Sequence, residues 1–312
     1  GGTITTVCTN FKVHTFTGPG TFCISAGEGA DAKVDFLVIA GGGGGGTSGS
    51  AGAGAGGYRE SKTASVSGCW SASPLVSTTP LGPFSPGAIP VTVGAGGATN
   101  PAPPSQGATG SNGSPSIFST ITSAGGGYGG ARGPDIGPIT NGGPGGSGGG
   151  GSWGIPGTGP GAGSSVAGTG NTPPVSPPQG NNGGTGRHNG PTHSTPGGGG
   201  GAGGVGPSEG SGGPAGYGTG NGAPGVASSI TSSPVTRAGG GGGETGYGGA
   251  GGPGGGGTAS PGTPTANRAG TANTGGGGGG GPACAPGGEG PVPNPGAGTG
   301  GSGIVIIRYK FQ

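Results

Sequence analysis

Residues Lys33 to Ile39 read KVDFLVI and run through Ala40 directly into six consecutive glycines, Gly41 to Gly46. The first part has the β-branched, aromatic and aliphatic side chains of a buried strand, and it is too short to span a membrane. Glycine loses more conformational freedom on folding than any other residue, so the second part suggests a flexible linker. The alternative is an ordered bundle of extended, threefold, left-handed helices of the polyproline II kind, joined sideways by backbone hydrogen bonds.

The composition excludes several fold classes. Of 312 residues, 100 are glycine and 33 are proline, and only 26% belong to the hydrophobic set, which is too little for an ordinary globular core. A disordered tail usually carries high charge, whereas 6% of these residues are charged and the net charge is +2. The glycines stand in blocks instead of at every third position, which excludes a collagen helix. Asp31, Asp35 and Asp135 are too few aspartates for a calcium-binding β-roll.

The charges and motifs predict neither catalysis nor cofactor binding. Lysines and arginines are spread from Lys12 to Lys310 without a cluster, which argues against nucleic acid or an anionic membrane as partner. No stretch predicts membrane insertion. G-x-G-x-x-G matches arise by chance in so much glycine, and none follows a strand and opens a helix. The acidic residues stand singly, and no Cys or carboxylate accompanies His188 and His193. We therefore expect no enzyme, no cofactor and no metal.

Strands are predicted at both ends of the chain. Residues 3–25 suggest a β-hairpin around Gly18-Pro19-Gly20, with Phe16 and Phe22 facing each other across the turn. KVDFLVIA gives a third strand, and GSGIVIIRYKFQ, residues 301–312, gives a fourth that is the expected partner of the third. Counting outward from the turn puts Cys8 and Cys23 out of register, so the pairing of the four cysteines stays open: Cys8, Cys23, Cys69 and Cys284.

Between these strands, glycine runs alternate with segments rich in Pro, Ser, Thr and Asn, which have the chemistry of turns and surface loops. A six-glycine run spans roughly 19 Å at about 3.1 Å per residue, the length of an ordinary strand. SIFSTITSAGGG, residues 116–127, and VASSITSSPVTRAGGGGG, residues 226–243, repeat the pattern of a short apolar leader before a glycine run. The pattern predicts stacked elements in which a side chain at a packed position would displace a neighbour.

The predicted fold is thus a stacked polyglycine II helix bundle bracketed by short antiparallel β-strands, with no α-helix. One glycine-rich domain is expected over residues 1–312. Its hairpin and entry strand occupy residues 1–40, its polyglycine helices and loops residues 41–303, and its closing strand residues 304–312.

Aromatic residues in the connecting segments are the best candidates for a binding site, because Trp and Tyr supply contact area at low entropic cost. Trp70 and Phe84 have two interpretations: exposed binding residues, or a small core within a hairpin of YRESKTASVSG and IPVTVGAGG. Trp153 in GSWGIPG is expected to be exposed. Arg187, His188 and His193 complete the candidate set. Asn112-Gly113-Ser114 is a glycosylation sequon by rule and a common turn by composition.

The series VDFLVIAGGGGGG, PVTVGAGG, SAGGGYGG, SSITSSPVTRAGGGGG and GGSGIVIIRY resembles the glycine-rich domain at the distal ends of bacteriophage tail fibres. It is also similar in design to the tip adhesins of T-even-like phages, in which polyglycine II helices stack and loops at one end select the receptor. The resemblance covers nearly the whole chain, but no family binding residue maps individually onto it.

This resemblance implies a non-enzymatic, extracellular adhesin of the virion that binds a bacterial surface glycan or outer-membrane protein. The rest of the tail fibre would be its second partner, with a homotrimer as the implied assembly. Two alternatives stay open. One is a structural or matrix filament protein in which the bundle itself is the function. The other is an ice-binding protein, although the Pro-rich loops interrupt the strict three-residue period that a flat face requires.

Overall fold

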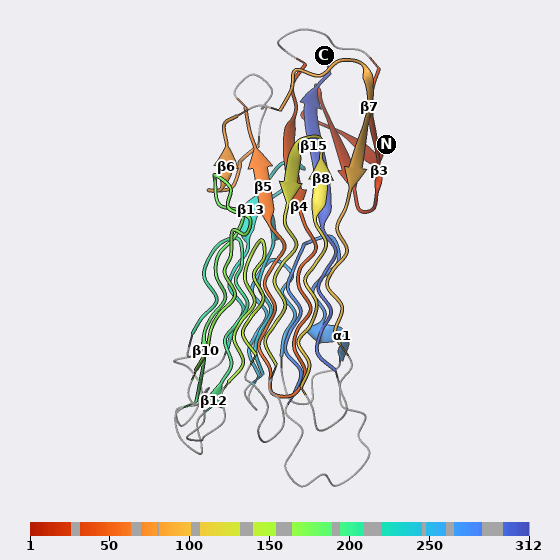
Figure 1. Cartoon of the computed structure of the whole chain (residues 1–312). Helices are drawn as coiled ribbons and strands as arrows, with labels where there is room; N and C mark the ends of the chain where they lie inside the picture. Colours follow the sequence, from red (N-terminus) through yellow and green to blue (C-terminus); the bar gives the residue numbers. More distant parts are fainter. Residues whose placement is uncertain are drawn as a thin grey trace.

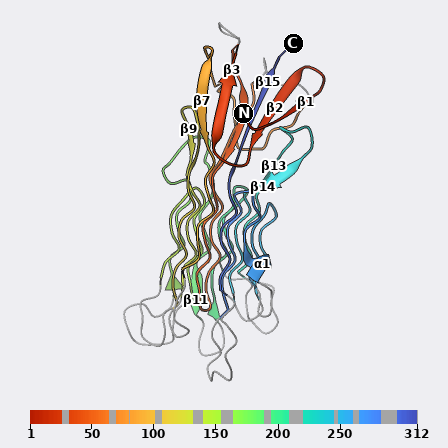
Figure 2. The same ribbon diagram turned by 90° about the vertical axis from the view of Figure 1, so that its right-hand side faces the viewer.

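A computed structural model of the chain describes residues 1–25, 32–63, 70–79, 81–100, 107–131, 140–153, 164–188, 194–208, 220–244, 248–259, 265–282 and 296–311. These residues form two parts, a β-sheet cap that holds both termini and a bundle of extended runs that continues from it (Figures 1 and 2). The end of the bundle opposite the cap, where the strands β10–β12 and the short helix α1 lie, is called the far end below.

Ten strands form the two sheets of the cap. The larger sheet has the order β1 (Thr3–Val7), β2 (Phe11–Phe16), β15 (Ile304–Lys310), β4 (Asp35–Ile39), β5 (Tyr58–Ser61) and β6 (Val76–Ser77). The smaller sheet has the order β3 (Gly20–Ile24), β7 (Gly87–Thr92), β8 (Ser116–Phe118) and β9 (Ile121–Ser123).

The remaining elements are short. β13 (Val226–Ser228) and β14 (Val235–Arg237) form a hairpin, and β10 (Ser164–Ser165), β11 (Gly186–His188) and β12 (Ser194–Thr195) form a three-stranded sheet. Among the described residues the only α-helix is the single turn α1 (Thr265–Arg268), so the prediction of an essentially non-helical fold is confirmed.

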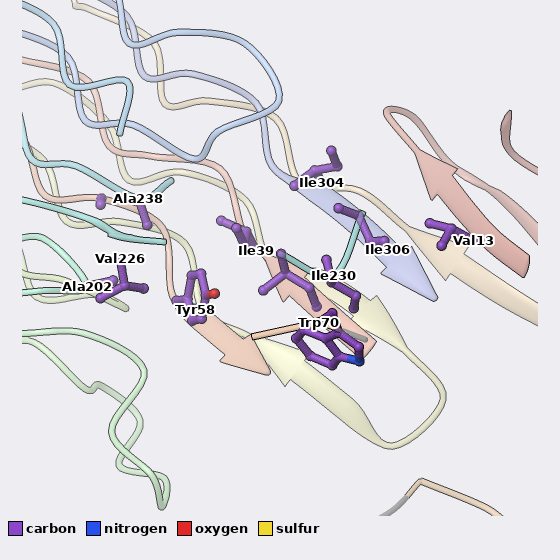
Figure 3. Packing of buried hydrophobic residues seen from close by; sticks show 12 residues of the cluster. Val13, Ile39, Tyr58, Trp70, Ala202, Val226, Ile230, Ala238, Ile304 and Ile306 are labelled. Carbon is purple, nitrogen blue, oxygen red and sulfur yellow. The ribbon is translucent and has the colours of Figure 1, made fainter. Parts of the chain in front are cut away.

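The two strands predicted to pair, β4 and β15, lie at the centre of the larger sheet and are antiparallel, with Ile304 opposite Ile39. Both are buried on two faces, which explains their unbroken apolar runs. One face packs against the smaller sheet through the cluster Phe16, Phe22, Val34, Phe36, Val38, Val91, Phe118, Val305 and Ile307. The other face is covered by Trp70 and by the β13–β14 hairpin with its connecting residue Ile230 (Figure 3).

The predicted hairpin over residues 3–25 is wrong in its pairing. β2 pairs with β1 and β15, whereas β3 pairs with β7 in the smaller sheet. The Gly18-Pro19-Gly20 turn therefore carries the chain from one sheet to the other. Phe16 and Phe22 still belong to one buried cluster, because the two sheets enclose it between them.

The cysteines follow this topology. Cys23 is a free thiol and Cys8 is disulfide-bonded, so no Cys8–Cys23 bond closes the N-terminal strands. Cys69 and Cys284 lie outside the described residues.

The run Gly41–Gly46 donates its backbone N–H groups to three different neighbouring runs in a step of three residues. The bonds are between 2.9 and 3.1 Å long: residues 41 and 44 bond to Ser114 and Ser111, residues 42 and 45 to Gly301 and Gly298, and residue 43 to Gly54. A period of three is that of the polyproline II helix, whose backbone groups all point outward.

The carbonyl groups of the same run accept bonds from three further runs. Residues 41 and 44 accept from Gly126 and Gly129, residue 42 from Gly97, and residues 43 and 46 from Gly278 and Gly281. Gly41–Gly46 is thus a central polyglycine II helix enclosed by neighbours on all sides. The interpretation as an ordered bundle holds, and the flexible-linker interpretation is wrong.

Runs at the surface of the bundle show the same period in their burial. In residues 107–115, Gly110 is buried and Gly113, three residues on, is half-buried, whereas Asn112 and Pro115 are exposed. The prediction that any side chain at a packed position displaces a neighbour is too strict, because three alanines of the central run 50–57 are fully buried: Ala51, Ala53 and Ala55. The packing of neighbouring runs accommodates a methyl group at these positions.

Asparagine–glycine pairs recur where a surface run meets its neighbour. In the four described pairs the Asn side-chain Oδ1 accepts the backbone N–H of the adjacent run: Asn112 from Tyr128 (3.0 Å), Asn141 from Val166 (2.9 Å), Asn182 from Gly170 (2.8 Å) and Asn221 from Ala250 (2.9 Å). The next glycine N–H donates to that same run: Gly113 to Gly126, Gly142 to Val166, Gly183 to Gly168 and Gly222 to Ala250, at 2.8 to 3.0 Å.

The side-chain oxygen thus replaces the backbone acceptor that a surface run lacks on its outer side. The glycine is required by space, since a Cβ on Gly113 would lie 2.1 Å from the carbonyl oxygen of Gly41. Residues 112–114 therefore belong to an extended run and not to the turn that composition suggests.

We expect Gly43→Val to destabilise the protein more than Val38→Ala, the reverse of the order in an ordinary core. A Cβ on Gly43 would lie 2.2 Å from the backbone oxygen of Gly127, which cannot move without shifting a second run. We expect a loss above about 4 kcal/mol, against about 2–4 kcal/mol for the fully buried Val38. Urea unfolding measures both.

Gly18→Val is the matched control for Gly43→Val, because nothing lies within 4 Å of a Cβ on Gly18. We expect its effect to stay within about 0.5 kcal/mol. Equal losses in the free energy of unfolding for the variants at positions 18 and 43 would contradict the close packing of the glycine runs.

His14 of β2 gives the cap a pH dependence. Its ring is buried, with Nδ1 2.9 Å from the carbonyl oxygen of Gly1 and Nε2 3.2 Å from the hydroxyl of Tyr309. Burial lowers the pKa of His14 below 6.5, the hydrogen bond to Gly1 opposes this change, and the charges of the N-terminus and Lys12 add to it.

We therefore expect the free energy of unfolding to decrease as the pH falls through 6.5, because the unfolded chain takes up a proton that the folded chain resists. The loss should level off below the folded pKa. Urea unfolding between pH 7.5 and 5.5 measures it, and His14→Gln should remove most of the slope. An identical slope in the variant would show that another group is responsible.

Candidate functional site

The two ends of the bundle differ in chemistry. The cap end holds both termini and the apolar clusters, whereas the far end holds β10–β12, α1 and the ends of the glycine runs (Figures 1 and 2). The far end is therefore the candidate site for binding.

Hydroxyl groups terminate neighbouring runs at the far end. Ser165 Oγ donates to the carbonyl of Ser152, Ser152 Oγ to that of Thr140 (3.1 Å), and Thr140 Oγ1 to that of Ala131 (2.7 Å). These side-chain bonds add to lateral backbone bonds at the ends of the runs, since the carbonyls of Ala131 and Thr140 also accept the backbone N–H groups of Thr140 (3.3 Å) and Ser152 (3.5 Å). Sequence reasoning missed this hydroxyl belt, although the signal was present as a Ser or Thr directly beside many of the glycine runs.

The sheet β10–β12 lies next to this belt and places one candidate at its centre. Arg187 of β11 is opposite Ser164 on one side and Thr195 on the other, and its side chain is exposed. His188 follows it and is opposite Ser194. Trp153 directly follows Ser152 and is half-buried, where exposure was predicted. The structure thus brings Trp153, Arg187 and His188 to one end of the molecule.

Trp70 is not part of this surface. Its side chain is 6% exposed within the buried cluster (Figure 3), its Nε1 donates to Asp35 Oδ2 at 3.2 Å, and Lys62 Nζ lies 5.2 Å from the ring centre. The interpretation of Trp70 as an exposed binding residue is wrong, because the indole is needed to cover the open face of the larger sheet.

Phe84 belongs to a different apolar cluster of the cap. It is half-buried beside the smaller sheet, with its ring centre 6.2 Å from that of Phe118. The proposed small core shared with Trp70 is also wrong, since β5 pairs with β4 and β7 pairs with β3 and β8. His193 lies outside the described residues.

The charges at the far end are unevenly distributed. Glu244 and Arg268 are both buried, and Arg268 Nη1 donates to the carbonyl of Gly296 at 3.1 Å. Burial lowers the pKa of Arg268, and the charge of Glu244 opposes this change. Among the described residues of the far end, Arg187 is the exposed cation and no carboxylate is exposed.

The far end therefore offers a half-buried indole and an exposed guanidinium, which suit non-covalent binding of a polar partner, whereas the hydroxyls of Ser152, Ser165 and Thr195 are buried. The described residues contain no group of three or more His, Cys, Asp or Glu side chains that could hold a metal ion. They also contain no helix with the length and hydropathy of a membrane span.

A family model described as a glycine-rich domain matches residues 16–310, which include the cap, the bundle and the far end. No curated protein matches the sequence.

Substitutions should separate the structural tryptophan from the surface residues. We expect Trp70→Ala to lower the free energy of unfolding by about 3–5 kcal/mol, because it opens a buried cluster and removes a hydrogen bond to a buried carboxylate. Trp153→Ala should cost about 1 kcal/mol and Arg187→Ala less than about 0.5 kcal/mol. Urea unfolding measures all three, and a loss at position 153 as large as that at position 70 would place Trp153 in the core.

Proposed function

The chain belongs to the glycine-rich domain family, and we propose that it is a receptor-binding domain of a bacteriophage tail fibre. In this proposal the bundle is a scaffold, the cap end is joined to the rest of the fibre, and the far end binds the host surface. In this proposal the domain binds its receptor and catalyses no reaction.

The observation that carries the proposal is that the two ends of the molecule differ. Both termini lie at the cap end (Figure 1), and the opposite end holds Arg187 and His188 of β11 (Figure 2) together with Trp153, which follows Ser152 of the hydroxyl belt. A bundle whose central run is hydrogen-bonded to neighbours on all sides holds such a surface rigidly. Rigid presentation lowers the entropic cost of binding, and loops on a rigid scaffold are the usual place for recognition.

The chemistry of the far end favours a bacterial surface glycan or a polar loop of an outer-membrane protein as the receptor. Trp153 supplies a flat apolar surface, and Arg187 supplies a fork of N–H donors between two hydroxyl-bearing residues. Sugars present both apolar C–H faces and hydroxyl groups, so these two side chains match them.

The test is the binding of fluorescently labelled protein to a panel of bacterial strains. We expect binding to some strains, and a loss of about tenfold in affinity for Trp153→Ala or Arg187→Ala. Lys310→Ala is the matched control, because it removes one exposed positive charge at the cap end. Unchanged binding by both far-end variants, together with a loss for Lys310→Ala, would overturn the proposed orientation. Absence of binding to every strain would overturn the adhesin proposal.

A further inference from the structure

The four Asn–Gly pairs in the described part of the bundle carry a chemical property that the adhesin proposal does not use. In an Asn–Gly sequence the glycine nitrogen can attack the side-chain carbonyl carbon of the preceding asparagine, since no Cβ hinders ring closure. The glycine N–H proton is lost to base, the bond to the amide nitrogen breaks and ammonia leaves, which gives a five-membered succinimide. Water then opens the ring to aspartate or isoaspartate.

Both reacting groups are engaged in the folded bundle. The glycine N–H that must lose its proton donates to a carbonyl of the adjacent run, at 2.8 Å for Gly222 and 3.0 Å for Gly113, Gly142 and Gly183. The asparagine oxygen accepts an N–H of that same run, which holds the amide toward the neighbour. Ring closure requires both bonds to open.

The packing allows few other residue pairs at the positions of this reactive sequence. The outer position needs a short side chain with an acceptor, and all four asparagines are exposed there. The following position faces an inner run: a Cβ would lie 2.1 Å from a carbonyl oxygen at Gly113, 2.0 Å at Gly142, 2.1 Å at Gly183 and 1.9 Å at Gly222. Asparagine followed by glycine satisfies both demands.

We propose that these four pairs, Asn112–Gly113, Asn141–Gly142, Asn182–Gly183 and Asn221–Gly222, are deamidation sites gated by the bundle. They are closed while the surface runs are bonded laterally and react when a run opens. Isoaspartate adds one methylene group to the main chain, which breaks the three-residue period. A run that has reacted in this way cannot restore its lateral bonds, so the modification makes a transient opening permanent.

The first test compares the folded protein with the protein in urea, both at pH 8.5 and 37 °C. Mass spectrometry of proteolytic peptides follows the conversion of each amide to an acid. We expect each of the four pairs to react at least about tenfold more slowly in the folded protein, because opening limits the rate. Equal rates in the two states would overturn the proposal without any variant.

The second test opens one side of a chosen pair. Val166→Pro removes the N–H that binds Asn141 and keeps the Val166 carbonyl that binds Gly142, and Ala250→Pro does the same for Asn221 and Gly222. Proline fits the polyproline II backbone, and both positions are exposed. We expect Val166→Pro to accelerate deamidation at Asn141 alone and Ala250→Pro at Asn221 alone, each by about tenfold.

Each proline variant is thus the control for the other, and Val166→Ala and Ala250→Ser, which keep the N–H, should leave all four rates unchanged. Thermal melting shows whether each variant retains the folded bundle. Folded proline variants with unchanged rates at their own sites would overturn the gating by the side-chain bond, as would a uniform acceleration at all four pairs.

Discussion

The lateral hydrogen bond between the backbones of neighbouring polyglycine II helices is the interaction on which this structure depends. A single helix of this kind has no internal hydrogen bonds, so each run is ordered only by those around it. Fixing one residue costs about 1–2 kcal/mol, and one hydrogen bond returns about 0.5–1.5 kcal/mol net. Close packing and Cα–H···O contacts must supply the remainder, and they require a bundle in which inner runs are fully enclosed. The bundle is therefore cooperative by construction.

The β-sheet cap fixes the point at which the bundle begins. β4 leads directly into the central run Gly41–Gly46, and β15 leaves the bundle beside β4, so the antiparallel register of these two strands sets the relative height of the runs joined to them. The cap also contains buried charges that link its layers. Asp35 accepts bonds from Thr63 and Trp70, and Arg308, opposite Asp35 in register, donates to the carbonyl of Ile230 at 2.9 Å. The apolar clusters of the cap thus stabilise a bundle that buries few large apolar side chains of its own.

The sequence predicts the fold class well because its two determinants are local. An apolar strand that enters a glycine run specifies β4 and the central helix, and the strand Ile304–Lys310 is recognised by the same criterion. The partners of β3 and β7 could not be predicted, because Phe16 and Phe22 satisfy a hairpin and a two-sheet core equally well from spacing alone. Trp70 was misplaced for a related reason: its segment lacks strand periodicity, and only the assembled sheet shows that one face needs a cover. At the far end, the sequence singled out Arg187 and His188 as candidates but not the hydroxyl belt, whose successive members are 9 to 13 residues apart and follow no local period.

The close packing of the runs also explains at which positions the residue can vary. At most glycines of the central runs an added Cβ would already lie about 2 Å from a backbone oxygen, so these positions tolerate little change. Surface runs are less restricted, but their Asn–Gly pairs are fixed by the need for an acceptor outside and empty space inside. At the far ends of the runs, hydroxyl side chains add hydrogen bonds to the lateral bonds of the backbone. Since the cap occupies the other end, the far end is where polar side chains, in addition to the glycine backbone, join neighbouring runs.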